Sequence, residues 1–170
     1  MLGGGGAAVI ESKGIFAGCR IADNGSGSTG GGISLGDTEA LVLNCTVVRN
    51  QAQSGGGIFV ITDGGNEIRS TIAWDNAAPS SSSIHVDGNQ PLVVYGCIEG
   101  GWPGVGNIDV DPDLTDYSTW SDVLYVGSPC IDSGDPLPNL NDSVVWPGWY
   151  ENGARSDMGA YGGVTTYLWK

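Results

Sequence analysis

Three aspartates in the second half of the chain alternate with other residues and could act together on a substrate. Asp109, Asp111 and Asp113 lie two residues apart. On a β-strand their side chains would therefore share one face, with roughly 6.5 to 7 Å between neighbours. Carboxyl groups at such a separation can divide the work of a general acid and a water-activating base. The alternative is structural, because aspartates in turns commonly accept hydrogen bonds from nearby backbone amides.

A second group of oxygen-bearing side chains, further along the chain, could hold a calcium ion. Asp132, Asp135 and Asp142, with two asparagines among them, offer hard oxygen ligands within eleven residues. Pro136 and Pro138 interrupt this run, and no bidentate glutamate follows as in an EF-hand. The alternative is that Asp132 and Asp135 hydrogen-bond the turn in which they lie.

Several aromatic side chains supply flat, amphipathic surfaces that could stack on sugar rings. Trp146 and Trp149 lie in the long stretch that follows the acidic group, and they are the candidates for ligand binding. Trp74, Trp102 and Tyr95 lie earlier. The alternative for all of them is packing in the core or in a cap.

A repeat of 26 residues defines the elements that must position these groups. The same spacing recurs in three columns: Asn24, Asn50 and Asn76; Cys19, Cys45, Thr71 and Cys97; and Phe16, Val42, Ile68 and Val94. A repeat of this length is typical of a solenoid, in which each unit buries its apolar face against the next. Since the units contain short β-favouring runs separated by Gly, Asn, Asp and Ser, we predict coils of short strands.

The asparagine column predicts a hydrogen-bonded ladder. Asparagine tolerates left-handed backbone at a turn, and its amide can hydrogen-bond the same amide one coil further on. One residue earlier lie Asp23, Arg49 and Asp75, which predicts a cation between two anions at a strand spacing of roughly 4.8 Å. Exposed ion pairs of this kind contribute little to stability.

The cysteine column leaves two states open. Cysteines in adjacent coils lie at a separation that a disulfide could tolerate. We expect free, inward-facing thiols instead, because Thr71 occupies the same column without such chemistry. A zinc site is disfavoured, since there is no Cys-x-x-Cys spacing and His85 is the only histidine.

Taken together, the units and the strings that follow them resemble the right-handed parallel β-helix of the pectate-lyase-like superfamily, in particular its bacterial surface-protein branch. The repeat reads NCTVVRN at residues 44–50 and GGGI at 55–58. The later strings are TIAWDN at 71–76, GNIDVDP at 106–112, GSPCIDSGD at 127–135 and RSDMGAYG at 155–162. Together, the repeat units and these strings extend over nearly the whole chain.

The resemblance implies an all-β, right-handed parallel β-helix with about four 26-residue coils over residues 1–104. Residues 105–170 should then form final irregular coils and a loop-rich C-terminal cap within a single continuous domain. We expect further strands at Ile108–Val110, Val123–Val126 and Met158–Tyr161. The loop from Asp135 to Ser156 should fold over the end or the side of the solenoid.

The resemblance also implies two kinds of chemistry. Polysaccharide lyases of this superfamily hold calcium with acidic residues and use a lysine or arginine as base, whereas its hydrolases use clusters of aspartates. This chain shows no clear basic residue beside a carboxylate cluster. We therefore expect a non-catalytic structural or interaction module that binds a polysaccharide or another protein on its loop-bearing side. A carbohydrate-active enzyme fragment and a truncated gene product are the alternatives.

The net charge of the chain and the length of its apolar runs indicate which classes of partner are disfavoured. Six basic and nineteen acidic residues give a net charge of -13, which disfavours nucleic acid and anionic lipid. No apolar run reaches the roughly 18 residues of a membrane span, and the N-terminus lacks a signal-peptide pattern, although proteins of the resembled type are mostly secreted or surface-attached. The chain starts inside a coil, so we expect self-association through that uncovered N-terminal coil.

Overall fold

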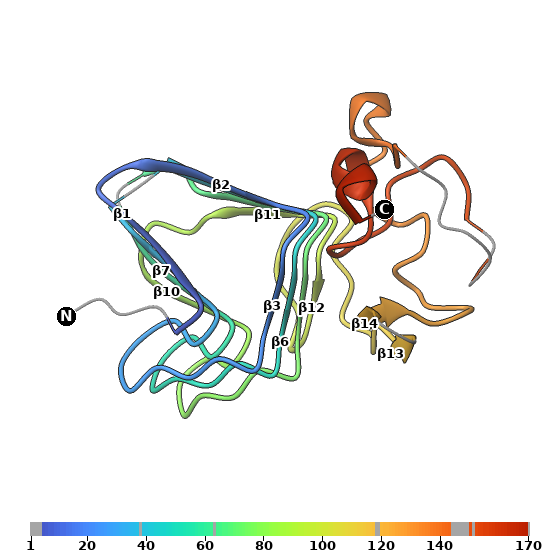
Figure 1. Cartoon of the computed structure of the whole chain (residues 1–170). Coiled ribbons are helices and arrows are strands. Elements are labelled where there is room, and N and C mark those ends of the chain that lie inside the picture. The colour runs from blue at the N-terminus through green and yellow to red at the C-terminus, as the bar shows by residue number, and fades with distance from the viewer. Residues whose placement is uncertain are drawn as a thin grey trace.

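The computed structural model describes residues 5–37, 39–62, 64–117, 120–143, 150 and 152–169. The predicted all-β solenoid is confirmed: the chain winds as a right-handed parallel β-helix, with three sheets around a triangular core (Figure 1). Sheet A contains β1 (Ala7–Ile10), β4 (Ile33–Gly36), β7 (Ile58–Thr62) and β10 (Ile84–Gly88). Sheet B contains β2 (Lys13–Ala17), β5 (Glu39–Leu43), β8 (Glu67–Arg69) and β11 (Leu92–Val94). Sheet C contains β3 (Arg20–Ala22), β6 (Thr46–Val48), β9 (Ile72–Trp74) and β12 (Cys97–Ile98).

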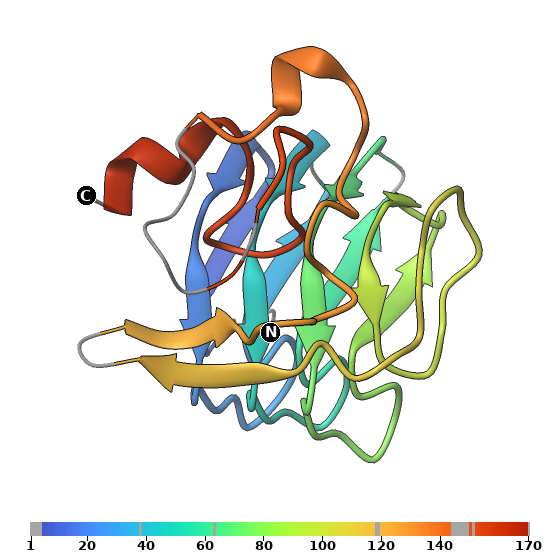
Figure 2. The ribbon, with the colours of Figure 1, turned by 90° about the vertical axis from the view of Figure 1, so that its right-hand side faces the viewer.

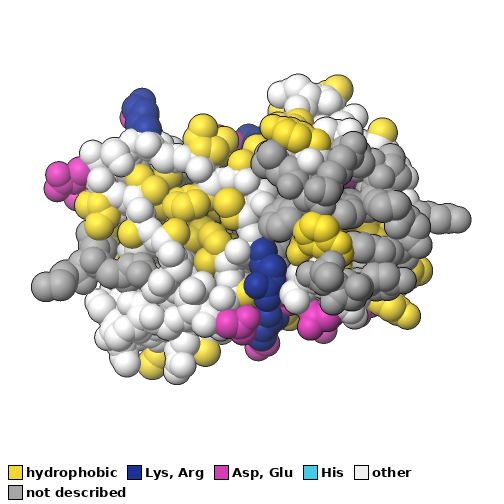
Figure 3. Space-filling view, viewed as in Figure 1, with side chains coloured by type: hydrophobic (Ala, Val, Ile, Leu, Met, Phe, Trp, Pro, Cys, Tyr) yellow, Lys and Arg dark blue, Asp and Glu magenta, His cyan; other side chains and the backbone are white. Residues whose placement is uncertain are grey.

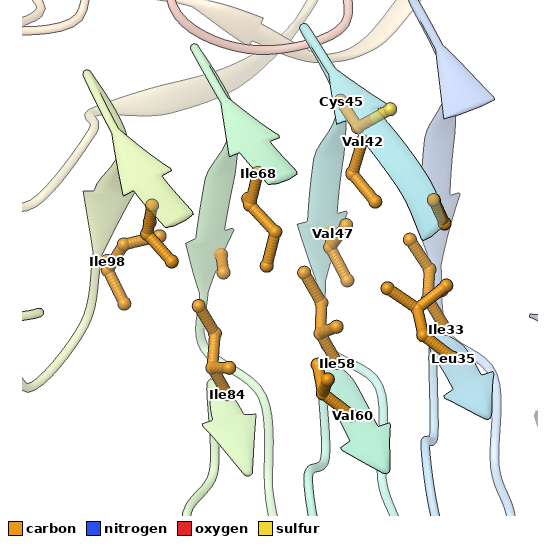
Figure 4. Close-up of a cluster of buried hydrophobic side chains, with 13 residues drawn as sticks. Ile33, Leu35, Val42, Cys45, Val47, Ile58, Val60, Ile68, Ile84 and Ile98 are labelled. Atoms are coloured by element: carbon orange, nitrogen blue, oxygen red, sulfur yellow. The ribbon is translucent and has the colours of Figure 1, made fainter. Parts of the chain in front are cut away.

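All pairings in these sheets are parallel and link each coil to the next. Three full turns separate β1 from β10, so the strands are stacked four deep. Alternation along each strand sends every second side chain inward. The inward set forms the core and is almost entirely apolar; it includes Ile33, Leu35, Val42, Val47, Ile58, Val60, Ile68 and Ile84 (Figure 4).

Single residues with left-handed backbone make the sharp bends between sheets. Asn44 (φ 46°) and Ser70 (φ 49°) turn the chain from sheet B into sheet C. After sheet C the left-handed residues are Asp23, Arg49 and Asp75, with φ between 51° and 61°. The expectation that the asparagine column itself is left-handed is therefore wrong by one residue, because the bend comes just before it.

The fourth coil is shifted by one residue relative to the predicted repeat. Thr62 pairs with Gly88 at the end of sheet A, but Glu67 pairs with Leu92 at the start of sheet B. The turn between them is one residue shorter in the fourth coil than in the third. Ile68 consequently pairs with Val93, so Val94 does not belong to the predicted apolar column.

The same shift moves Cys97 out of the cysteine column. Cys97 pairs with Ile72, whereas Ile72 pairs with Thr46, the residue after Cys45. A shift of one residue along a strand turns the side chain to the opposite face of the sheet. Cys97 therefore lies on the outer face of sheet C rather than in the core.

The C-terminal segment, which we define as the described part of residues 111–169, lies against the outer face of sheet C (Figures 1 and 2). It contains an antiparallel hairpin of β13 (Leu114–Tyr117) and β14 (Trp120–Leu124). Two short 3₁₀ helices follow, η1 (Pro138–Leu140) and η2 (Gly163–Trp169). Of the other expected strands, Ile108 makes only an isolated bridge to Cys97, and residues 158–161 form turns.

Sheet C needs this cover because it is apolar on both faces. Val47 and Ala73 point into the core, whereas Val48 and Ile72 point outward and are buried. Strands that are buried on both faces read as continuous apolar runs. The C-terminal segment supplies the outer layer, which includes Leu124, Cys130, Tyr150 and Met158.

The end of the solenoid is closed by a different segment, residues 99–108. Trp102 packs against the core cluster there. The Asn107 side chain accepts a hydrogen bond from the Gly96 amide and donates to the Val93 and Trp102 carbonyls, which occupies backbone groups at the exposed edge.

Among the described residues there is no helix with the length and apolarity needed to cross a membrane.

Candidate functional site

A groove of about 330 Å³ lies where the hairpin β13–β14 approaches the outer face of sheet C. Its lining combines an aromatic wall with charged groups: Val48, Arg49, Trp74, Asp75, Asp111, Pro112, Leu114 and Asp122. The residues come from two coils of the solenoid and from the C-terminal segment. The groove therefore exists only because the C-terminal segment is folded onto the side of the β-helix.

Trp74 forms the aromatic part of the groove. It is the last residue of β9 and pairs with Val48 in the preceding coil, on the outward-facing side of sheet C. Trp74 is partly buried and packs against the apolar cluster that Val48 and Leu114 also join. This packing fixes the indole while leaving part of its surface in the groove.

Asp122, on β14, anchors the charged side of the groove. Its carboxylate accepts hydrogen bonds from Arg49 Nη1 at 2.7 Å and from Arg20 Nε at 2.6 Å. Arg49 also contacts Asp23, with Nε 2.9 Å from Oδ1. One carboxylate thus links arginines from the first and second coils to the C-terminal segment. Figure 3 shows basic and acidic side chains adjoining one another at this junction.

The arginines keep the two carboxylates ionised. Burial by itself would raise the pKa of Asp122, but Arg49 and Arg20 outweigh it and the net pKa is lowered. The hydrogen bond from Arg49 likewise lowers the pKa of Asp23. The groove therefore presents charges that are already fixed by pairing.

The predicted ion-pair ladder along Asp23, Arg49 and Asp75 is only half present. Arg49 pairs with Asp23, but its other contacts go to Asp122. The backbone amide of Asp75 instead donates to the Glu99 carboxylate at 2.9 Å. The partner that displaces Asp75 is 73 residues away from Arg49 in the sequence, where the spacing of the repeat gives no signal.

Asp109, Asp111 and Asp113 do not share one face of a strand. Residues 109–113 lie outside any strand, and the three side chains are exposed. Asp109 accepts a hydrogen bond from the Gly100 amide, and Asp111 accepts one from the Asp113 amide. Asp113 itself has left-handed backbone, with φ 50°. Only Asp111 lines the groove, so the three do not form a carboxylate pair with a common substrate face.

The three aspartates suggested for calcium have different partners in the structure. Asp135 is buried, forms an ion pair with Arg69 and accepts a hydrogen bond from the Leu137 amide. Asp132 and Asp142 instead lie near Asp157, which the calcium prediction did not include. Asp157 is fully buried and accepts hydrogen bonds from the Asp132 amide and from the Tyr150 hydroxyl, each at 2.7 Å.

Burial dominates the electrostatics of this carboxylate cluster. It raises the pKa of Asp157 to about 7 and that of Asp142 to about 6, and neighbouring aspartates add to both shifts. Asp142 accepts hydrogen bonds from the Asp157 amide and from Asn152, and it ties these segments together. No group of three or more His, Cys, Asp or Glu side chains within the described ranges is arranged to hold a metal ion. The signal for Asp157 in the sequence is its place in the string at 155–162.

The asparagine column forms a continuous ladder through the first three coils. Asn24 Nδ2 donates to Asn50 Oδ1 at 3.0 Å, and Asn50 Nδ2 donates to Asn76 Oδ1 at 3.1 Å. The backbone amides of Asn24 and Asn50 donate to the same oxygens. Each inward-pointing amide thus also satisfies the backbone of the bend.

The cysteines and the remaining aromatic candidates lie in several places. Cys19, Cys45, Cys97 and Cys130 are free thiols. The Thr71 hydroxyl accepts a hydrogen bond from the Cys45 amide, as expected for neighbours in one column.

The Arg155 guanidinium lies 5.8 Å from the centre of the Tyr95 ring. Trp146 and Trp149 lie outside the described residues.

Comparison of the chain with family models, curated proteins and solved structures gave no match. The case for any function therefore depends on the side chains around the groove.

Proposed function

We propose that the protein is a non-catalytic carbohydrate-binding module of the pectate-lyase-like type, which holds a sugar unit in the groove between sheet C and the β13–β14 hairpin. The observation that carries the proposal is the position of Trp74, which lies in the groove beside charged groups. Sugars present apolar C–H faces and polar edges, and an aromatic ring flanked by hydrogen-bonding groups matches both.

The polar groups of the groove are suited to orienting hydroxyl groups. Arg49 and Asp122 are held in place by their mutual ion pair, and Asp75 and Asp111 offer further carboxylate acceptors. Groups that are already fixed lose little conformational freedom when they bind a ligand. The β13–β14 hairpin also does not need to rearrange for these groups to contact a ligand.

The charge of the site favours a neutral polymer over an acidic one. Among the described residues that line the groove, three carry carboxylates and one carries a guanidinium, which is already paired. The chain as a whole carries a net charge of -13. A polyuronate would therefore be repelled, whereas a neutral polysaccharide would not.

The loop-bearing side that the sequence suggested offers a weaker site. A hollow there is lined by residues of sheet B such as Lys13, Ile15, Glu39 and Leu41, together with Gly65 and Glu67 of the third coil. None of the described residues that line it is aromatic. We therefore propose that carbohydrate binds at the outer face of sheet C.

The test measures retention of the purified protein on insoluble neutral polysaccharides and on a polyuronate, with isothermal titration of soluble oligosaccharides for the polymers that retain it. Trp74→Ala should weaken binding by about tenfold or more, because it removes the stacking surface. Tyr125→Ala is the matched control, since Tyr125 is an exposed aromatic residue of the C-terminal segment that lies outside the groove. Release of new reducing or unsaturated ends would contradict a non-catalytic role.

We also retain the proposal that the protein self-associates through its first coil. Val9, Phe16 and Ile21 of that coil are only partly buried against the core. Figure 3 looks onto this end of the solenoid and shows hydrophobic side chains gathered within its triangular outline. Strands β1, β2 and β3 lie at the edges of their sheets, and strand edges can pair with another chain. A monomer at micromolar concentration in size-exclusion chromatography with light scattering would contradict this proposal.

A further inference from the structure

Two buried cysteines, one from the solenoid and one from the C-terminal segment, meet on the outer face of sheet C. Cys97 lies on β12, and Cys130 lies in the GSPCIDSGD string 33 residues later. Both thiols are fully buried, and both belong to the apolar cluster beneath the C-terminal segment. The two side chains are neighbours within that cluster, where Cys97 is the residue that acts most strongly on the Cys130 thiol.

The surroundings hold both side chains in place. Cys97 Sγ donates a hydrogen bond to the Val110 carbonyl at 3.1 Å. The carbonyl of Cys130 accepts a hydrogen bond from the Met158 amide at 3.0 Å, and its amide donates to the Ser128 hydroxyl at 3.2 Å. In the folded protein the backbone on either side of the pair is therefore held in place without a covalent bond. This arrangement depends on the one-residue shift of the fourth coil, which brings Cys97 to the outer face.

We propose that Cys97 and Cys130 form a disulfide when the chain folds in the presence of a disulfide oxidant, and that this bond fastens the C-terminal segment to the solenoid. In the reaction, the two thiols lose two protons and two electrons and form one S–S bond. The oxidant, a small-molecule disulfide such as oxidised glutathione, is reduced to two thiols. This proposal is independent of carbohydrate binding.

The bond should form during folding rather than afterwards. The contact with Cys97 and the burial of the thiol both raise the pKa of Cys130, so the folded protein offers almost no thiolate there. In the unfolded chain both thiols are exposed and have ordinary acidity. Folding then brings them together around a loop of 33 residues.

The second thiol pair in the protein provides an internal comparison. Cys19 and Cys45 are neighbours in adjacent coils of the core, and Cys19 is only partly buried. The hydrogen bond from Cys45 lowers the pKa of Cys19 to about 6, so Cys19 should react first with alkylating reagents. A double variant Cys19→Ala/Cys45→Ala removes this pair and leaves Cys97 and Cys130 as the only cysteines.

The experiment refolds the wild-type protein and this double variant from denaturant, with a reduced and oxidised glutathione mixture or with reductant alone. Free thiols are then blocked, and the protein is cleaved on the amino side of aspartates. This cleavage leaves Cys97 within residues 87–108 and Cys130 within residues 122–131. Trypsin would not separate them, because no lysine or arginine lies between Arg69 and Arg155.

We expect mass spectrometry without reduction to show the two peptides joined in both proteins after refolding with glutathione. The oxidised protein should have a thermal unfolding midpoint roughly 10 °C higher than the reduced protein, because the bond closes a loop of the unfolded chain. Cys130→Ala should abolish the joined peptide and remove the shift. Recovery of both cysteines as blocked thiols or glutathione adducts in correctly folded protein would overturn the proposal.

Discussion

The Asp122 carboxylate lies 2.7 Å from Nη1 of Arg49 and thereby fastens the β13–β14 hairpin to the second coil of the solenoid. Arg49 follows β6 at a left-handed bend, so its guanidinium points away from the core and toward the hairpin. The same carboxylate also holds Arg20 of the first coil. One side chain of the C-terminal segment thus spans two coils and forms one wall of the groove.

Replacing this carboxylate should loosen the C-terminal segment. In Asp122→Asn the two arginines lose their shared anion, and only 5% of the Asp122 side chain is exposed. We expect the free energy of unfolding to fall by about 2 kcal/mol, less than for a fully buried pair because Arg49 is partly solvated. Urea denaturation measures the change.

Asp87→Asn is the control for this variant. Asp87 is exposed at the end of β10, so its replacement should change the free energy of unfolding by less than about 0.5 kcal/mol. Equal stability of the two variants would show that the Asp122 ion pairs contribute nothing.

The raised pKa values of Asp142 and Asp157 predict that the stability of the protein decreases as the pH rises from about 4 to about 7. Burial raises the pKa of Asp157 from its usual 3.8 to about 7 and that of Asp142 to about 6. The folded protein therefore binds these protons more tightly than the unfolded chain does, and the stability they provide is lost as they dissociate. Urea midpoints at pH 4.5 and 7.5 test the sign.

Asp157→Asn should remove most of this pH dependence, because an amide does not titrate. Its oxygen can still accept the hydrogen bond from the Asp132 amide. Asp109→Asn, at an exposed turn, should leave the slope as in the wild type. A stability that increases over the same interval in the wild type would contradict the assignment.

The asparagine ladder should be most sensitive at its middle. Asn50 is fully buried, and its amide group donates to the Ile21 and Val48 carbonyls as well as to Asn76. Asn50→Ala leaves several buried polar groups without partners, so we expect a loss of about 3 kcal/mol in the free energy of unfolding. Chemical denaturation followed by far-ultraviolet circular dichroism measures it.

Asn24→Ala provides the matched comparison at the end of the ladder. Asn24 is only partly buried, so water can replace some of its hydrogen bonds, and we expect a loss of about 1 kcal/mol. A larger loss for Asn24 than for Asn50 would mean that the ladder is not the source of the stability.

Gly159 should be essential for docking the C-terminal segment. Its φ of +95° is unfavourable for other residues, and a Cβ there would lie 2.8 Å from both Ile72 Cδ1 and Thr46 Oγ1. We expect Gly159→Ala to lower the free energy of unfolding by about 2 kcal/mol or more and to expose the segment to limited proteolysis. Gly27→Ala is the control, because no atom lies within 4 Å of its Cβ position.

The local pattern of the sequence was sufficient to predict the solenoid. The spacing of Asn24, Asn50 and Asn76 predicts coils of similar length, and the short β-favouring runs predict parallel strands. Both features depend on neighbours along the chain and on the same position one coil away. The strands of sheet A accordingly start at residues 7, 33, 58 and 84, close to the predicted spacing.

The register of the fourth coil and the groove were decided only by the tertiary structure. A turn that is shorter by one residue leaves the β-favouring runs of the coil unchanged. It nevertheless moves Cys97 from the core to the outer face of sheet C. The partners of Arg49 and of Asn44 in the C-terminal segment lie 73 and 112 residues away. Such pairs carry no periodic signal, because they form only when two surfaces with separately determined shapes pack together.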